Sequence, residues 1–121
     1  MRHVLYRRDR VLRPRTGLPV RAIAVADGWC DASGNCNYNR AVTLPYPASA
    51  ERLWREDRVY DLIVVLGHNE RPRLRGRGSA IFMHAARAGF APTEGCMALT
   101  PRDLRQVLAL VGRGSRVCVL G

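Results

Sequence analysis

The chain has no lysine: all 20 of its lysine or arginine positions are arginine, set against 10 acidic residues. Aromatic residues are few, at 7%, and no apolar run approaches the ~20 residues that a membrane-spanning helix needs. The first 15 residues carry arginines throughout and lack the apolar core of an export signal. With 11 glycines and 7 prolines, usage is ordinary, which excludes collagen-like and disordered chains.

Cysteine is also scarce, with four residues and no pair in CxxC spacing. This excludes a disulfide scaffold, a zinc ribbon and a thioredoxin motif, and we expect neither a metal nor a cofactor. Cys30 and Cys36 share one loop and could pair in an oxidising compartment, although such spacing is common by chance. Cys118 is expected to serve packing.

What the chain does have is positive charge, with a net charge of +10 and a pI near 10.9. Such a surface favours anionic partners, and arginine binds phosphate and carboxylate equally well through its planar guanidinium. Nucleic acid, acidic lipid and an anionic cell-wall polymer are all compatible with this charge. The sign of the charge does not distinguish among these partners.

The hydrophobic pattern predicts a single domain, residues 1–121, of mixed but mainly β structure with two short helices. Residues 1–16 are predicted to form a basic N-terminal arm or edge strand. The dense Gly, Asn and Asp of Asp27–Arg40 predict a loop, in which Trp29, Tyr38 and Asn39 either shape a cleft or fold the loop on itself. Strands are expected at Val20–Val25, Tyr60–Leu66, Ser79–His84 and Ser115–Leu120.

Two stretches carry helix signals. Ser49 followed by apolar residues at helical spacing predicts a short helix over about 50–57. Thr100, Pro101 and Asp103 predict a capped helix start, followed by apolar residues at i, i+3, i+4 and i+7. Gly112 is expected to end this second helix.

One stretch could carry chemistry. His84 closes a predicted strand, and Cys96 follows twelve positions later after Gly95. A glycine lets the backbone turn tightly before the cysteine, and successive N–H groups in such a turn can point at a developing oxyanion. A cysteine nucleophile needs a neighbouring imidazole, and His84 is the nearest in sequence. Judged on spacing alone, a structural role for both residues stays open.

The segments that contain His84 and Cys96 resemble those of a known family. The sequence resembles the YkuD-type L,D-transpeptidase catalytic domain in its segments GSAIFMH and TEGCMAL, and in DGWCDASGNCNYNR, LPYPASAERLWRE and YDLIVVLGHN. The resemblance covers about residues 17–120 and points to a short, basic, single-domain branch. It implies a YkuD-like β-sandwich. Because family domains usually begin with further strands, it also raises the expectation of a sheet truncated at its N-terminus.

The resemblance further implies a cysteine-dependent peptidoglycan L,D-transpeptidase. Cys96 would attack the carbonyl of a meso-diaminopimelate residue in a stem tetrapeptide, release D-alanine and form a thioester. His84 would act as base, and backbone N–H groups of Gly95 and Cys96 would form the oxyanion hole. An amine acceptor gives a 3→3 cross-link and water gives L,D-carboxypeptidase hydrolysis. Carbapenem-type β-lactams are the implied inhibitors, and the substrate implies a periplasmic or cell-envelope location.

Some positions depart from the family pattern or add to the site. Glu94 stands where the family has a second histidine, Ala98 where it has Arg or Asn, and Ala85 where a glycine often follows the strand histidine. Because of these differences, hydrolysis and a changed substrate remain alternatives to transpeptidation. Arg87 could grip a stem-peptide carboxylate or be a solvated surface residue. Thr93 and Glu94 are further candidates for substrate binding.

Two other functions are also considered for this sequence. A basic nucleic-acid-binding module would bind with a steep salt dependence, but the low aromatic content and the lack of a recognition motif argue against it. An inactive relative that keeps the fold and binds wall peptide is the third possibility. The leading prediction involves neither nucleic acid nor a membrane span.

Overall fold

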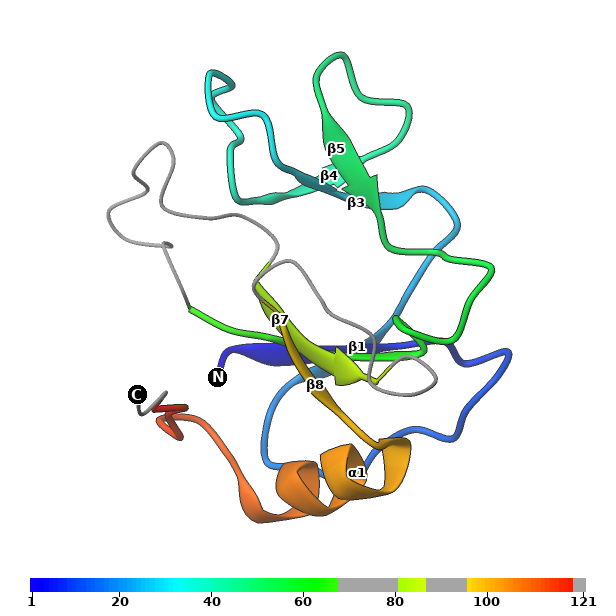
Figure 1. Cartoon of the computed structure of the whole chain (residues 1–121), viewed down its shortest axis with the longest axis vertical. Helices are drawn as coiled ribbons and strands as arrows, with labels where there is room; N and C mark the ends of the chain where they lie inside the picture. Colours follow the sequence, from blue (N-terminus) through cyan, green and yellow to red (C-terminus); the bar gives the residue numbers. More distant parts are fainter. Residues whose placement is uncertain (68–80, 87–95, 119–121) are drawn as a thin grey trace.

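A computed structural model describes residues 1–67, 81–86 and 96–118, which form two β-sheets and one helix (Figure 1). The larger sheet has five strands in the order β2-β1-β6-β7-β8, and the smaller has three in the order β4-β3-β5. The strands of the larger sheet are β1 (His3–Tyr6), β2 (Val20–Ala22), β6 (Leu62–Val65), β7 (Phe82–Ala85) and β8 (Met97–Leu99). Those of the smaller sheet are β3 (Asp27–Cys30), β4 (Ala41–Thr43) and β5 (Ala50–Arg52).

The larger sheet is mixed in strand direction. Its centre is antiparallel, since β1 and β7 both run against β6. Its two flanks are parallel, because β2 pairs with β1 and β8 pairs with β7 in the same direction. The parallel pair at the β8 edge places residues of β7 beside residues that lie 14 positions later in the sequence, such as Met83 beside Met97.

Side chains alternate between two apolar layers, one on each face of this sheet. Leu5, Ile63 and Phe82 point toward the smaller sheet and pack with Trp29 and Leu53. Their neighbours Val4, Val64 and Met83 belong to the opposite layer, which includes the helix residues Leu104 and Leu108. The sheet is therefore buried on both faces, with the smaller sheet on one side and helix α1 (Pro101–Leu110) on the other (Figure 1). This agrees with the family fold that the sequence suggested.

Helix α1 begins as the sequence predicts. Thr100 is its N-cap, with the side-chain Oγ1 accepting a hydrogen bond of 3.1 Å from the backbone N–H of Asp103, and Pro101 occupies the first turn. The helix ends at Leu110, two residues before Gly112. Beyond it Gly17 lies so close that an added Cβ would stand 2.9 Å from the carbonyl oxygen of Val111. Within the described ranges no helix is long and apolar enough to cross a membrane.

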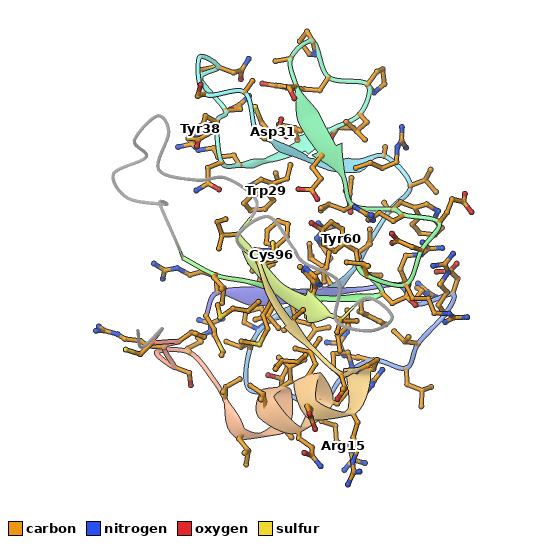
Figure 2. The ribbon with its side chains drawn as sticks, in the orientation of Figure 1. Arg15, Trp29, Asp31, Tyr38, Tyr60 and Cys96 are labelled. Atoms are coloured by element: carbon orange, nitrogen blue, oxygen red, sulfur yellow. The ribbon has the colours of Figure 1, made fainter. Side chains whose placement is uncertain are left out.

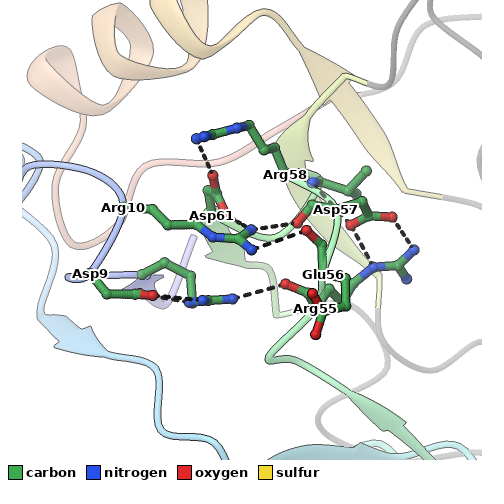
Figure 3. Close-up of polar contacts among 9 residues, drawn as sticks. Asp9, Arg10, Arg55, Glu56, Asp57, Arg58 and Asp61 are labelled. Carbon is green, nitrogen blue, oxygen red and sulfur yellow. Dashed lines mark hydrogen bonds and ion pairs between the residues drawn. The ribbon is translucent and has the colours of Figure 1, made fainter.

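Two arginines after β1 hold the chain that leads into β6 (Figure 3). The buried Arg7 donates to the carbonyl of Arg55 at 2.9 Å, pairs with Asp9 at 2.7 Å and lies 3.5 Å from the centre of the Trp54 ring. Arg10 donates to the backbone carbonyls of residues 56 and 57 and to the Asp61 carboxylate, at 2.9 to 3.0 Å. The network fixes the irregular segment 53–61 without regular secondary structure.

The structure corrects several expected elements. The helix expected over about 50–57 is absent, because Ala50–Arg52 form strand β5 against β3. The loop expected from residue 27 begins only after Cys30, since Asp27–Cys30 is the central strand of the smaller sheet. Pairing between strands decides both cases, with β3 paired on both sides and β5 paired with β3, and the local sequence does not show those partners.

Three further boundaries differ. The N-terminal segment was expected to be an arm or an edge strand, but β1 lies inside the sheet between β2 and β6. The strand expected over Val20–Val25 ends at Ala22. The strand expected at the C-terminal end is not formed by residues 115–118, and the rest of that stretch lies outside the described residues.

The layer beneath the sheet generates a stability prediction. Leu108 is fully buried against the sheet, whereas Leu110, two residues later in the same helix, is 88% exposed. Leu108→Ala should lower the free energy of unfolding by about 2–5 kcal/mol through lost burial and the resulting cavity. The matched Leu110→Ala should change it by no more than about 0.5 kcal/mol. Urea unfolding followed by circular dichroism measures both, and equal losses would contradict the layer assignment.

Candidate functional site

The parallel pairing of β7 and β8 brings the two leading sequence candidates onto one face of the sheet. Met83 pairs with Met97 and His84 with Ala98, so Cys96 stands opposite Phe82. The backbone N–H of Phe82 donates to the Cys96 sulfur at 3.4 Å. Because side chains alternate along a strand, Phe82, His84 and Cys96 all face the smaller sheet. Strand geometry puts the Cα atoms of His84 and Cys96 roughly 8 Å apart across the pair.

His84 is buried, with 2% of its surface exposed. Its ring atom Nδ1 lies 2.7 Å from the carbonyl oxygen of Ala85. A carbonyl can only accept, so Nδ1 carries a proton and donates it to this bond. In the neutral ring Nε2 is then the basic nitrogen, which is the tautomer that a general base requires.

Aromatic rings surround the two candidates. The Tyr60 ring meets the His84 ring edge-on with centroids 5.5 Å apart, and meets the Phe82 ring at 5.8 Å. Trp29, from the smaller sheet, meets the other side of Phe82 at 5.1 Å. Figure 2 shows Trp29, Tyr60 and Cys96 in the layer between the two sheets. This edge-on packing restricts the imidazole to one orientation.

A carboxylate enters the same layer from the smaller sheet. Glu51 pairs directly with Trp29 across β3 and β5, so the two side chains share the face that looks toward Cys96. The Tyr60 hydroxyl donates a short hydrogen bond to Glu51. Burial, followed by this bond and the Glu51 charge, raises the pKa of Tyr60 well above its ordinary value. Tyr60 therefore stays a neutral phenol and a permanent donor.

The thiol of Cys96 is half-buried, and its surroundings disfavour the thiolate. Burial raises the pKa of Cys96, and the nearby Glu51 carboxylate raises it further, while the N–H of Phe82 acts in the opposite direction. Together these influences favour the neutral thiol over a preformed anion. Its chemistry needs a base to take the proton during the reaction.

The loop after β3 folds on itself. The Trp29 indole Nε1 donates to Asn39 Oδ1 at 3.1 Å in a buried bond, and Asn39 has a positive φ of 58°, which asparagine tolerates. Cys30 is buried and Cys36 exposed, and the two do not form a disulfide in this structure. Cys118 is exposed rather than packed, contrary to expectation.

The remaining predicted site residues are not all visible. Arg87, Thr93, Glu94 and Gly95 lie outside the described residues, so the oxyanion-hole and substrate-binding assignments at these positions stay predictions. Sequence reasoning missed Glu51 and Tyr60 as members of the site. Nothing local marked them, because Glu51 fell in the expected helix and Tyr60 at the start of the expected strand.

Other features of the described chain lie apart from Cys96. A cavity of about 770 Å³ borders the helix-side face, with Met97, Arg2 and Arg116 in its lining and neither Cys96 nor His84. Over the ranges 1–67, 81–86 and 96–118, no group of three or more His, Cys, Asp or Glu side chains is arranged to hold a metal ion.

Comparison with known proteins gives one match. The family model for the L,D-transpeptidase catalytic domain, YkuD, matches residues 4–119, almost the whole chain. No curated protein and no solved structure matches the chain significantly.

The hydrogen bond to Ala85 generates a prediction about the imidazole. In ¹⁵N NMR spectra at a pH where the ring is neutral, His84 should show a protonated Nδ1 and an unprotonated Nε2. His84→Gln identifies its signals among the three histidines. A ring protonated at Nε2 alone would contradict the assignment and remove the base from Nε2.

Proposed function

Because the chain belongs to the YkuD family of L,D-transpeptidase catalytic domains, we propose that it is a cysteine acyltransferase acting on peptidoglycan stem peptides. Cys96 is the nucleophile and His84 its base. The observation that carries the proposal is the placement of both side chains on the same sheet face, in adjacent parallel strands. His84 and Cys96 are twelve positions apart in the sequence, and the strand pairing brings them onto one face.

The donor reaction starts with the neutral thiol. The Cys96 sulfur attacks the carbonyl carbon of a meso-diaminopimelate residue in a stem tetrapeptide, while its proton passes to Nε2 of His84. The carbonyl electron pair moves onto oxygen and forms a tetrahedral oxyanion. When this collapses, the bond to the terminal D-alanine nitrogen breaks and the imidazolium donates the proton to the leaving amine. A thioester on Cys96 and free D-alanine result.

The acceptor decides the product. An amine of a second stem peptide, losing its proton to His84, attacks the thioester carbonyl and yields a 3→3 cross-link with the thiol restored. Water in the same position yields a tripeptide, which is the L,D-carboxypeptidase outcome. Both follow from one acyl-enzyme, so they differ only in which nucleophile reaches the carbonyl.

Charge supports this substrate class. With 20 arginines and a net charge of +10, the protein is suited to an anionic polymer, and stem peptides carry carboxylates that a guanidinium can bind in bidentate fashion. Arg87 is our candidate for such a contact, with Thr93 and Glu94 nearby in sequence. Backbone N–H groups of Gly95 and Cys96 are the proposed oxyanion hole. The family acts on the cell wall, which implies work in the cell envelope.

Acylation by a carbapenem tests the nucleophile. Incubation of the folded protein should add the mass of one opened β-lactam per chain, because the strained amide acylates Cys96 as the substrate does. Intact-mass spectrometry measures the adduct. It should vanish in Cys96→Ser and persist in Cys36→Ser, a matched change of an exposed cysteine. An adduct that follows Cys36, or none on folded protein, would overturn the assignment.

Turnover tests the base and the acceptor. With a meso-diaminopimelate tetrapeptide, chromatography should show D-alanine release accompanied by dimer, tripeptide or both. His84→Gln should slow release by at least about 100-fold, the scale of general-base contributions. Release unaffected by this change would contradict the role of His84.

A further inference from the structure

The charge that faces Cys96 comes from the other sheet. Glu51 lies on β5, shares a face with Trp29 and accepts the hydrogen bond of the Tyr60 hydroxyl. The Tyr60 ring in turn packs edge-on against the His84 imidazole. One phenol thus contacts both the carboxylate near the thiol and the ring of the proposed base.

From this geometry we propose that Glu51 and Tyr60 are positioning residues for Cys96, holding it as a neutral thiol until substrate attack moves its proton to His84. The proposal deepens the function above and rests on it for the role of His84. Tyr60 anchors the carboxylate, and Glu51 supplies the negative charge that opposes the thiolate. In the resting enzyme the sulfur is then poorly reactive toward alkylating agents and oxidants, which select thiolates.

Every described charged or titratable group around the sulfur can be placed. Glu51 approaches from β5, Tyr60 from the segment before β6, and His84 from β7. Arg55 lies behind Tyr60, its guanidinium carbon 5.2 Å from the ring centre, and is paired with Asp57 at 2.6 Å. That cation is engaged first by Asp57, and the Glu51 charge contributes more weakly to raising the pKa of Arg55. Glu94, two positions before Cys96, lies outside the described residues and has the same sign of charge as Glu51.

The anchoring by Tyr60 has a fixed geometric basis. The Tyr60 ring contacts both Phe82 and the Arg55 cation, while Arg7 and Arg10 fix the backbone of the segment before it. Glu51 is half-buried, and the Tyr60 hydroxyl supplies a hydrogen bond to its carboxylate from within the protein. The hydrogen bond keeps its charge in the layer that contains Cys96.

Alkylation kinetics test the proposal without requiring any turnover. Cys96 is the sole cysteine of the tryptic peptide spanning residues 88–102, so mass spectrometry follows its reaction with iodoacetamide separately from the other three cysteines. Rates are measured in buffers from neutral to strongly alkaline pH. Glu51→Gln should raise the rate at neutral pH about threefold to tenfold and move the profile toward lower pH, because a tenfold change in thiolate corresponds to one pKa unit. Glu56→Gln, an exposed carboxylate in the neighbouring segment, should leave the profile unchanged.

Tyr60→Phe separates anchoring from packing, since it keeps the ring and removes only the hydroxyl. It should raise the neutral-pH rate by less than Glu51→Gln does, and it should add nothing in the Glu51→Gln background, because Tyr60 acts through the carboxylate. A wild-type profile in folded Glu51→Gln, or additive effects in the double variant, would overturn the proposal. Failure of carbapenem acylation with these shifts intact would instead overturn the enzymatic function alone.

Discussion

The parallel ladder between β7 and β8 is the constraint on which the site depends. It sets Met83 opposite Met97, and the alternation of side chains then puts His84 and Cys96 together on the face toward the smaller sheet. A shift of this register by one residue would send Cys96 into the layer beneath the sheet, where Met97 now packs with α1 residues. The candidate site and the hydrophobic core therefore specify the same register, since Met83 is buried and Met97 packs in the helix-side layer only if the candidate pair faces the other way.

The layer between the two sheets determines the environment of Cys96, the proposed nucleophile. Trp29 and Tyr60 pack edge-on against Phe82, whose own N–H is bonded to the Cys96 sulfur. Dense aromatic packing excludes water from one side of the thiol and thus disfavours its charged form. The Tyr60 ring also packs edge-on against the imidazole of His84. The hydrogen bond from Nδ1 to the carbonyl of Ala85 determines the tautomer of that ring. A rigid base beside a neutral thiol suits proton transfer coupled to attack better than a permanent ion pair.

Local signals in the sequence predicted the parts of the fold that local physics determines. The cap at Thr100, the apolar spacing of α1 and the buried β6 were identified correctly, as was the placement of His84 on an inner strand. The helix predicted over 50–57 was wrong for a physical reason. The first three residues of this segment pair with β3, and this pairing overrides the helical spacing of the apolar side chains. Glu51 became part of the site through the same non-local pairing. A sequence without its pairing partners cannot show on which face such a residue will lie.

The register also explains a departure from the family pattern. Ala98, where the family has Arg or Asn, lies directly opposite His84 and on the same face. A guanidinium there would stand beside the imidazole and favour a thiolate at Cys96 while lowering the basicity of the ring. The methyl group of Ala98 leaves neither effect, and Glu51 adds a charge of the opposite sign. Both features act in one direction, because each favours the neutral thiol of Cys96 over the thiolate. Under the proposed mechanism, the reactivity of Cys96 would then depend on the basicity of His84 rather than on a preformed thiolate.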